Sequence, residues 1–296
     1  MTKFNHIKTP LSLILLLFFL GTSVNCSLET IAVRSTGGII ENTISAFYSE
    51  SDYELAKEAI SPFILQLEGL IRIDPGNPNL IINACKGYFG YALGFVEDES
   101  PERASVFYLR ARDYGLELLS SNQAVANSIQ RGDLETFESE IDKMRTKDLP
   151  ILFWTANSWA SYINLKRTDV EALADQSYVD VLMQKVLEID ENYFFASSHM
   201  YFGIVLGERG IAGGDLEKSK QHFEKCFEIT ENNFLLAYVM YAQYYAINAF
   251  EEDVFVAALK KVLDTPADVL PDYELLNVIA KRKAEILLKN KDEYFF

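Results

Sequence analysis

The sequence predicts an all-α protein whose helices, about eleven to thirteen in number, pack as tetratricopeptide-like pairs into a superhelix. Glycine and proline are scarce, at 15 and 8 residues, while leucine, alanine and glutamate recur throughout, as is typical of helical proteins. No segment alternates apolar and polar residues for long enough to predict a strand. One helical pattern, moreover, occurs four times along the chain. These observations favour stacked helical pairs over a sandwich or a barrel.

Residues 1–25 are predicted to be a lipoprotein signal peptide. Lys3 and Lys8 precede the apolar run 11–20, which is too short to span a bilayer as a stable helix but has the length of a signal-peptide core. Cys26 follows this core so closely that the segment resembles a bacterial lipobox, in which the cysteine thiol carries a diacylglycerol. We therefore expect Cys26 to be the lipid attachment residue.

The lipobox pattern is a variant, because Ser23 and Asn25 stand where leucine and a small residue are usual. Two alternatives therefore stay open, namely secretion with cleavage nearby and an uncleaved anchor. Ser27, which follows the cysteine, slightly favours sorting onward to the outer membrane.

Residues 26–296 are predicted to form a single helical domain, in which capping residues mark helix starts and proline or polar residues mark helix ends. The expected starts are the capping box Ser51-x-x-Glu54, Ser100-Pro101, Asp215 and Asp272. The expected ends are Asp74–Pro78, Asp190–Asn192 and Thr265-Pro266. The segment 120–149 interrupts the regular array, and we expect it to be an insertion between helical pairs.

The repeated pattern consists of a bulky residue, then glycine or alanine, then an apolar residue three positions further on. Its four copies are Phe89-Gly90-x-x-Leu93, Trp159-Ala160-x-x-Ile163, Phe202-Gly203-x-x-Leu206 and Tyr241-Ala242-x-x-Tyr245. A second amphipathic helix follows each copy, most clearly at Ala104-x3-Tyr108 and Ser219-x3-Phe223. We expect the small residue to let two helices approach closely, with an aromatic side chain filling the groove beside it.

Besides Cys26, the chain has two cysteines, Cys85 and Cys226, which are too few for a disulfide framework. We interpret them as small buried residues, although a single bridge between them in an oxidising compartment stays open. His222 lies four positions before Cys226 on one predicted helix, a spacing that suits half of a metal site. Because Cys226 occupies a packing position of the repeat, burial explains it better, and no metal is expected.

Charge and motif content exclude several classes of function. The chain has 27 basic and 43 acidic residues, for a net charge of −16, which argues against a nucleic-acid binder. Hydrophobic residues make up 49%, enough for a buried core and too many for wholesale disorder. None of the motifs HExxH, GxSxG, GxGxxG and GxxxxGK occurs. The sequence therefore predicts neither an enzyme nor a bound cofactor.

Two groups of residues are candidates for ligand binding. Arg110 and Arg112 either bind a carboxylate through their guanidinium groups or join neighbouring helices by salt bridges. The aromatic-rich helix expected at 152–165 is either an inner helix packed in the core or the wall of a ligand channel with few polar groups. Its candidate wall residues are Trp154, Asn157, Trp159 and Tyr162.

Four segments, in this order along the chain, resemble the T-component of TRAP transporters, a family of periplasmic tetratricopeptide-type lipoproteins. They are Tyr108–Leu116, Leu149–Ala156, Gly213–Lys218 with His222–Glu224, and Leu275–Lys283. The resemblance implies a lipid-anchored periplasmic accessory protein that works with the substrate-binding protein of a TRAP system. It also implies a homotrimer with a hydrophobic channel for a small apolar or organic-acid ligand. The alternative is a tetratricopeptide scaffold of the cell envelope that holds proteins together without a ligand.

Overall fold

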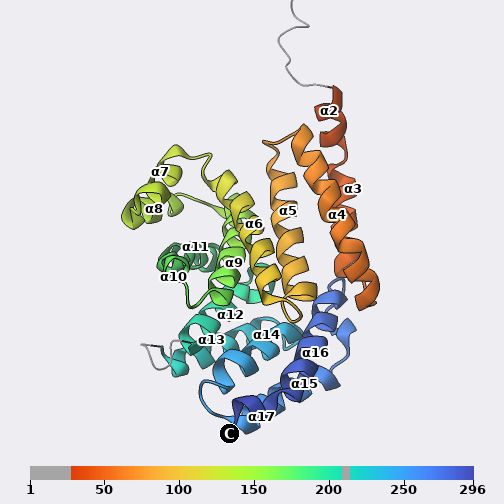
Figure 1. The fold of residues 1–296 in the computed structure, drawn as a ribbon, viewed down its shortest axis with the longest axis vertical. Coiled ribbons are helices and arrows are strands. Elements are labelled where there is room, and N and C mark those ends of the chain that lie inside the picture. The colour runs from red at the N-terminus through yellow and green to blue at the C-terminus, as the bar shows by residue number, and fades with distance from the viewer. Residues whose placement is uncertain (1–27, 209–213) are drawn as a thin grey trace, which may run out of the picture.

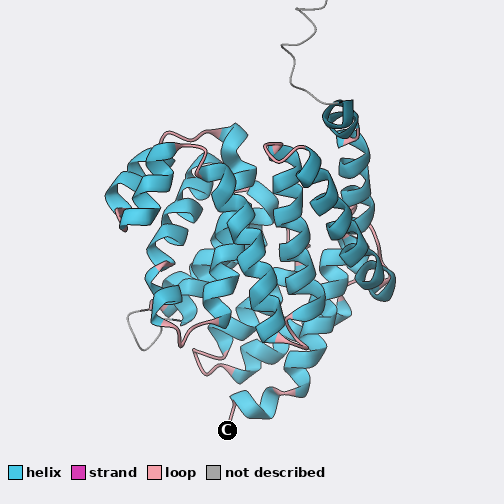
Figure 2. Cartoon of the chain, turned by 45° about the horizontal axis from the view of Figure 1, so that its top comes forward, coloured by secondary structure: helices cyan, strands magenta, loops and turns pink. Residues whose placement is uncertain are grey.

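Every regular element in the part of the chain that the computed structural model describes, residues 28–208 and 214–296, is a helix (Figure 2). The all-α prediction is therefore confirmed. The predicted signal peptide and Cys26 lie outside the described residues.

The helices of the first half run from the N-terminal side to the segment 120–149. They are α2 (Leu28–Ser35), α3 (Gly37–Tyr48), α4 (Tyr53–Ile73), α5 (Pro78–Tyr91) with its π-helical extension η1 (Ala92–Val96), α6 (Pro101–Leu119), α7 (Gln123–Arg131), α8 (Leu134–Ile141) and the 3₁₀ turn η2 (Thr146–Asp148). The second half follows the same pattern of short loops between helices. It contains α9 (Leu149–Leu165), α10 (Val170–Ala174), α11 (Gln176–Ile189), α12 (Tyr193–Glu208), α13 (Leu216–Ile229), α14 (Leu235–Met240) with its π-helical extension η3 (Tyr241–Ala246), α15 (Glu252–Asp264), the 3₁₀ turn η4 (Ala267–Val269), α16 (Glu274–Lys289) and α17 (Lys291–Tyr294).

Most of the helices belong to two packed groups (Figure 1). α4, α5, α6 and α9 stand side by side, and consecutive members pack closely. α12 to α17 lie across one end of this group, and α16 comes back against α3 and α4. Because the C-terminal helices return to the N-terminal ones, the space between the two groups is enclosed by helices from both halves.

The three predicted helix ends and the predicted start at Asp215 are confirmed, since α4, α11 and α15 end at Ile73, Ile189 and Asp264. Asn77 caps α5 by accepting the backbone N–H groups of Asn79 and Leu80, and Pro78 occupies its first turn. Asp215 caps α13 in the same way, through the N–H of Lys218.

Two predicted caps are wrong. α4 is capped by Asp52 rather than Ser51, because the Asp52 carboxylate accepts the N–H groups of Glu54 and Leu55. Asp272 does not cap α16, which begins at Glu274, and the backbone of Asp272 is left-handed with φ 65°. It therefore makes the turn that precedes the helix.

The small position of the repeat makes a close contact in one copy and leaves open space in another. A Cβ atom on Gly203 would lie 2.7 Å from the ring of Phe223, so here a small residue lets α12 approach α13 as predicted. At Gly90 no atom lies within 4 Å of the corresponding position, and the prediction of close approach is wrong there. The close approach occurs one turn later, at Gly94, where an added Cβ atom would lie 2.7 Å from Cδ1 of Ile279.

The segment 120–149 is itself a helical pair, made of α7 and α8. α8 packs against α11, where the rings of Phe137 and Tyr178 meet edge to face with 4.9 Å between centroids.

Both Cys85 and Cys226 are buried and free, and burial raises the pKa of each thiol to about 12. The cysteines are therefore packing residues in this structure, as interpreted from the sequence.

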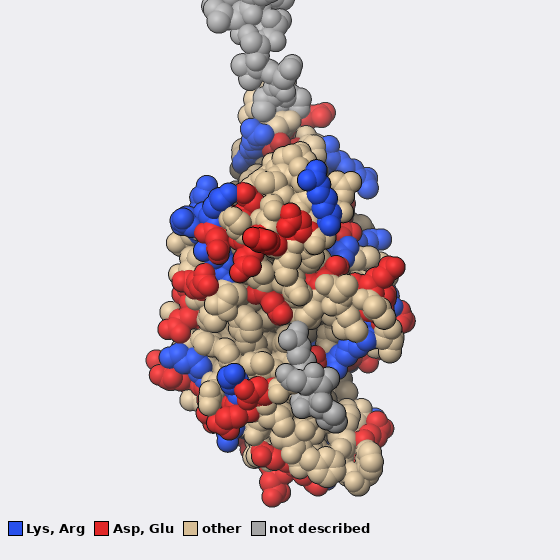
Figure 3. Space-filling view, turned by 90° about the vertical axis from the view of Figure 1, so that its left-hand side faces the viewer, with Lys and Arg blue, Asp and Glu red and all other residues tan. Residues whose placement is uncertain are grey.

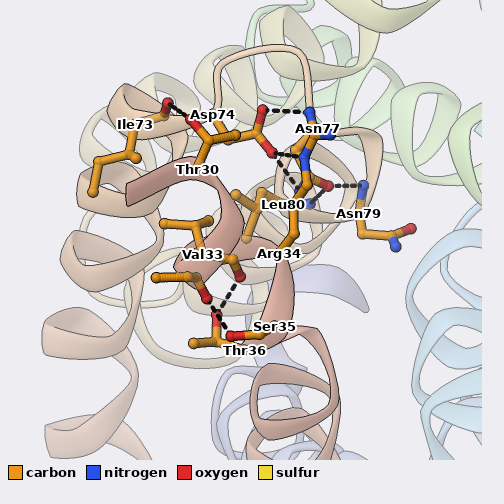
Figure 4. A network of polar contacts seen from close by, with 11 residues as sticks. Thr30, Val33, Arg34, Ser35, Thr36, Ile73, Asp74, Asn77, Asn79 and Leu80 are labelled. Atoms are coloured by element: carbon orange, nitrogen blue, oxygen red, sulfur yellow. Dashed lines mark hydrogen bonds and ion pairs between the residues drawn. The ribbon is translucent and has the colours of Figure 1, made fainter. Parts of the chain in front are cut away.

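The N-terminal helix α2 is fixed to the loop between α4 and α5 by a polar network (Figure 4). Arg34 binds the carboxylate of Asp74 at two points, with 2.8 Å from Nε to Oδ2 and 3.1 Å from Nη2 to Oδ1. Asn77 donates to the same carboxylate.

On the face that carries α7, α8 and α13, acidic side chains are interspersed with basic ones (Figure 3).

Candidate functional site

Three adjoining hollows form a row between the two groups of helices. The first, of about 600 Å³, lies among α9, α12 and α14 and includes the exposed Arg167; we call it the Arg167 vestibule. The second, of about 70 Å³, is the neck. The third, of about 550 Å³, includes Lys86 and the exposed Asn192, and we call it the Lys86 vestibule. Each vestibule thus reaches the surface.

The hollows adjoin because they share wall residues. Neck and Arg167 vestibule have five residues in common: Phe89, Leu93, Asn157, Met200 and Leu236. Neck and Lys86 vestibule have four in common: Tyr48, Lys86, Trp154 and Phe194. Together the three hollows form one row, which we call the passage, and its walls are largely apolar and aromatic, as in most small-ligand sites.

Helical periodicity brings these wall residues together. On α5 and its extension, Lys86, Phe89, Gly90 and Leu93 follow the spacing i, i+3, i+4 and i+7, which places them on one face. The missing side chain of Gly90 leaves room in the neck, since nothing lies within 4 Å of its absent Cβ. The repeat pattern predicted a close helix contact at this glycine, whereas in the structure the position is open space in the wall of the neck.

The polar groups of the Arg167 vestibule are paired with one another. The guanidinium of Arg167 forms an ion pair with Glu208 and also binds Asn164. The amide of Asn164 donates to the hydroxyl of Tyr244 over 2.8 Å, and burial raises the pKa of Tyr244 to about 12. This end of the row therefore presents an electrically balanced rim.

The Lys86 vestibule contains polar groups that are not paired in this way. Lys86 makes no ion pair and no hydrogen bond within residues 28–208 and 214–296, and its Nζ lies 5.8 Å from the centroid of the Trp154 ring. The indole Nε1 of Trp154 is buried without a hydrogen-bond partner. Burial raises the pKa of Tyr193 to about 12, and the nearby indole of Trp154 partly opposes that rise. The Tyr193 hydroxyl therefore lies near the indole N–H, which makes no hydrogen bond of normal geometry in the described chain.

The part of α12 that lines the neck and the Lys86 vestibule has a strained backbone. Phe194, Phe195 and Ala196 have φ values of 43°, 61° and 54°, in the left-handed region that side chains with a Cβ rarely adopt. The turn directs the ring of Phe194 against Trp154, with 4.8 Å between centroids, and places Phe194 in both the neck and the Lys86 vestibule. Strain of this kind is typical of functional sites.

Of the six residues that the sequence offered as ligand-binding candidates, two lie in the passage. Trp154 lines the neck and the Lys86 vestibule, and Asn157 lines the neck and the Arg167 vestibule. Both belong to α9, three positions apart on one face.

Trp159, Tyr162 and Arg112 lie outside the three hollows, and Arg112 contacts both rings. The Arg112 guanidinium lies 5.6 Å from the centroids of both rings and forms an ion pair with Asp113. The indole of Trp159 donates to Oδ2 of Asp175 over 3.1 Å.

Arg110 is also separate from the passage. It lies in a surface groove between α4 and α6, where its guanidinium is 5.8 Å from the ring of Tyr88. The structure therefore divides the candidates of the sequence into passage residues, an aromatic cluster around Arg112, and a groove.

Sequence reasoning missed Lys86 and Phe194. Lys86 precedes the first repeat copy at the i−3 position of Phe89, a signal that the spacing contained but that a lone lysine did not make evident. The position of the Phe194 ring depends on the left-handed turn, and no local sequence pattern predicts that turn.

His222 contacts His199 and not Cys226. The two Nδ1 atoms are 3.0 Å apart, and Nε2 of His199 is 3.5 Å from Glu191, while the Cys226 thiol donates to the backbone carbonyl of Phe195. No cluster of three metal-ligating side chains occurs where the chain is described.

No helix in residues 28–208 and 214–296 combines the length and the apolar character needed to cross a membrane. A family model described as TRAP transporter T-component (TAtT) matches residues 49–295. A search of curated proteins gives no match.

Proposed function

Because the chain belongs to the TRAP transporter T-component family, we propose that it is a lipid-anchored periplasmic accessory protein whose passage binds or passes a small apolar or organic-acid ligand. In this role it works with the periplasmic substrate-binding protein of the same transport system. Family membership supports the accessory role in a TRAP transporter, and the passage supports the ligand.

The row of three hollows is the observation that carries the ligand proposal. The two vestibules, of about 600 and 550 Å³, have the size of ordinary small-molecule pockets. The neck between them is lined mainly by Phe89, Leu93, Trp154 and other apolar side chains. A ligand with an apolar body removes this surface from water and gains about 25 cal/mol per Å² of apolar area buried.

The anchor and the assembly complete the proposal. Lipid at Cys26 holds the protein at a membrane on the periplasmic side, with the outer membrane slightly favoured by Ser27. Three copies related by closed cyclic symmetry form a homotrimer. Sedimentation of the lipid-free protein at micromolar concentration tests this state, and a clean monomer counts against it.

Filling the neck tests the ligand proposal. Gly90→Leu adds a side chain where nothing lies within 4 Å of the Cβ position. We expect binding of the neutral fluorescent probe Nile red to weaken roughly tenfold, since a displaced apolar group is worth about 1.4 kcal/mol or more. Gly69→Leu is the matched control, because Gly69 is exposed on α4 and also has no atom within 4 Å.

The outcome separates the two classes of function. Unchanged probe binding in Gly90→Leu, with the helical circular dichroism intact, removes the passage as the ligand site. If native mass spectrometry of the purified wild type also finds no retained small molecule, the scaffold of the cell envelope becomes the better reading.

A further inference from the structure

Lys86 is the ionic side chain that the neck and the Lys86 vestibule share. It extends from α5, is partly buried, and makes no ion pair and no hydrogen bond in the described chain. A partly buried ammonium without an ion-pair partner is costly, because it has lost part of its hydration. Lys86 is thus a cation without an ion pair in the described chain, beside an apolar neck.

The opposite end of the passage differs in this respect. Arg167 is also basic, but Glu208 neutralises it and Asn164 accepts further hydrogen bonds from it. An anion that enters the Arg167 vestibule therefore competes with an internal carboxylate, whereas an anion at Lys86 does not. The two ends of the passage therefore differ in charge, and an anion is expected to bind at the Lys86 end.

The groups around Lys86 are donors. The hydroxyls of Tyr48 and Tyr273 make no hydrogen bond with residues of the described chain, and their rings are 4.9 Å apart. Burial raises the pKa of Tyr48, so its hydroxyl keeps its proton. The indole Nε1 of Trp154 is a further donor, which makes no hydrogen bond of normal geometry within the described chain and has the Tyr193 hydroxyl nearby.

The titratable groups close to Lys86 do not replace a ligand. They are Glu41 on α3, Cys85 on α5 itself, and the tyrosines of the vestibule. Burial lowers the pKa of Lys86, and the attraction of Cys85 and the exposed Glu41 only partly offsets it. A carboxylate bound at Nζ would oppose the effect of burial, because it raises the pKa of Lys86 and stabilises the charged ammonium.

We propose that Lys86 binds the carboxylate of an organic acid whose apolar tail occupies the neck, so that the acid group lies in the Lys86 vestibule. The hydroxyls of Tyr48 and Tyr273 and the indole of Trp154 lie in the same vestibule as additional donors. This inference rests on the proposed function, because it assumes that the passage holds a ligand. It adds the ligand class, a monocarboxylic acid with an aliphatic tail, and the orientation.

Isothermal titration calorimetry with octanoate and 1-octanol tests the proposal on the intact lipid-free protein. The two compounds share their tail and differ in the acid group. We expect the wild type to bind octanoate more tightly than octanol. In Lys86→Met, which keeps the length and apolar stem of the side chain, octanoate should bind roughly tenfold to a hundredfold more weakly, as expected for the loss of a charged hydrogen bond. Octanol binding should hardly change.

Two further variants serve as controls. Lys260→Met removes the same charge from an exposed position of α15 and should leave both affinities unchanged. Lys86→Arg keeps the charge and should retain most of the preference for octanoate.

Three outcomes overturn the proposal. They are a wild type that binds no octanoate, a wild type that prefers octanol, and a Lys86→Met variant, folded by circular dichroism, that keeps the octanoate preference. In the last case, Nile red binding that is still weakened by Gly90→Leu shows that the passage holds ligands and that only the assignment of Lys86 fails.

Discussion

Arg34 binds Asp74 at two points, and this ion pair joins the first helix of the described chain to the loop between α4 and α5. α2 begins just after Cys26, so in an anchored protein this pair lies between the membrane attachment and the helical body. The hydrogen bond from Arg34 is the main cause that lowers the pKa of Asp74.

Loss of the Arg34 side chain should release α2 without unfolding the rest. In Arg34→Gln, we expect faster amide hydrogen exchange in α2 and a melting temperature close to that of the wild type, since local openings are independent of the core. The control is Lys57→Gln, which removes an exposed pair with Glu99 and should leave α2 exchange unchanged. The same exchange in α2 for both variants would mean that the ion pair does not hold the helix.

The pH dependence of this contact has a defined sign. A carboxyl whose pKa is lowered in the folded protein stabilises it above its ordinary pKa of 3.8 and loses that contribution as the pH falls through the lowered value. α2 protection should therefore persist at neutral pH and decline below about pH 4.

The glycines of the repeat should respond to alanine in opposite ways. Gly203→Ala forces a Cβ to within 2.7 Å of Phe223, and we expect a net loss of about 1–3 kcal/mol in unfolding free energy. Gly90→Ala meets no atom and should be neutral or stabilise the helix by up to about 1 kcal/mol. Urea unfolding measures both, and equal losses at the two positions would show that Gly90 is a helix contact after all.

These two glycines show how far the sequence could predict the structure. The periodicity was sufficient to predict helices, and it gave Gly203 its correct packing role, because composition and spacing are local properties. It failed at Gly90, where the pattern is the same but no atom lies within 4 Å of the Cβ position, because the neighbours of a helix face depend on residues far away in the chain.

The candidate site was predicted in part for the same reason. Trp154 and Asn157 lie in the passage, whereas Trp159 lies on another face of the same helix and contacts Asp175 and Arg112. A single helix pattern places side chains on faces but does not say which face meets a hollow. Lys86 acquires its importance only from the absence of a partner, which requires the whole fold to be known.

His199, which is buried, and His222, which is half-buried, should make the protein less stable in mild acid. Burial is the main cause that lowers the pKa of both His199 and His222, and His199 further lowers that of His222. A histidine with a lowered folded pKa is neutral in the folded state, while the unfolded chain binds a proton below its ordinary pKa of 6.5. The free energy of unfolding should therefore keep its full value, as far as the histidines are concerned, above pH 6.5 and fall as the pH decreases below it.

Urea midpoints at about pH 7.5 and about pH 5.5 bracket the ordinary histidine pKa while most carboxylates stay ionised. His222→Gln should reduce the difference between the two midpoints. An unchanged difference in this variant would assign the acid sensitivity to other groups.

The proposed anchor predicts a change of fractionation. One acyl chain binds a membrane weakly, whereas several together hold almost irreversibly, so Cys26→Ser should move the protein from the membrane fraction to the soluble periplasm. Cys85→Ser, at a buried position, should not relocate the protein. A Cys26→Ser variant that still pellets with membranes, together with no lipid labelling of the wild type, would rule out the lipobox interpretation.

Trp154 and Trp159, five positions apart on α9, should separate ligand binding from stability. Trp154→Phe keeps an aromatic ring in the neck but removes its indole N–H, so we expect altered Nile red affinity and little change in melting temperature. Trp159→Phe removes the hydrogen bond that the indole donates to the Asp175 carboxylate. Burial already raises the pKa of Asp175, so its charged form is costly. Leaving that carboxyl without its donor should cost about 1–3 kcal/mol, with probe affinity unchanged. If Trp159→Phe instead weakens probe binding while its unfolding free energy stays at the wild-type value, Trp159 belongs to the ligand path and the passage extends beyond the three hollows.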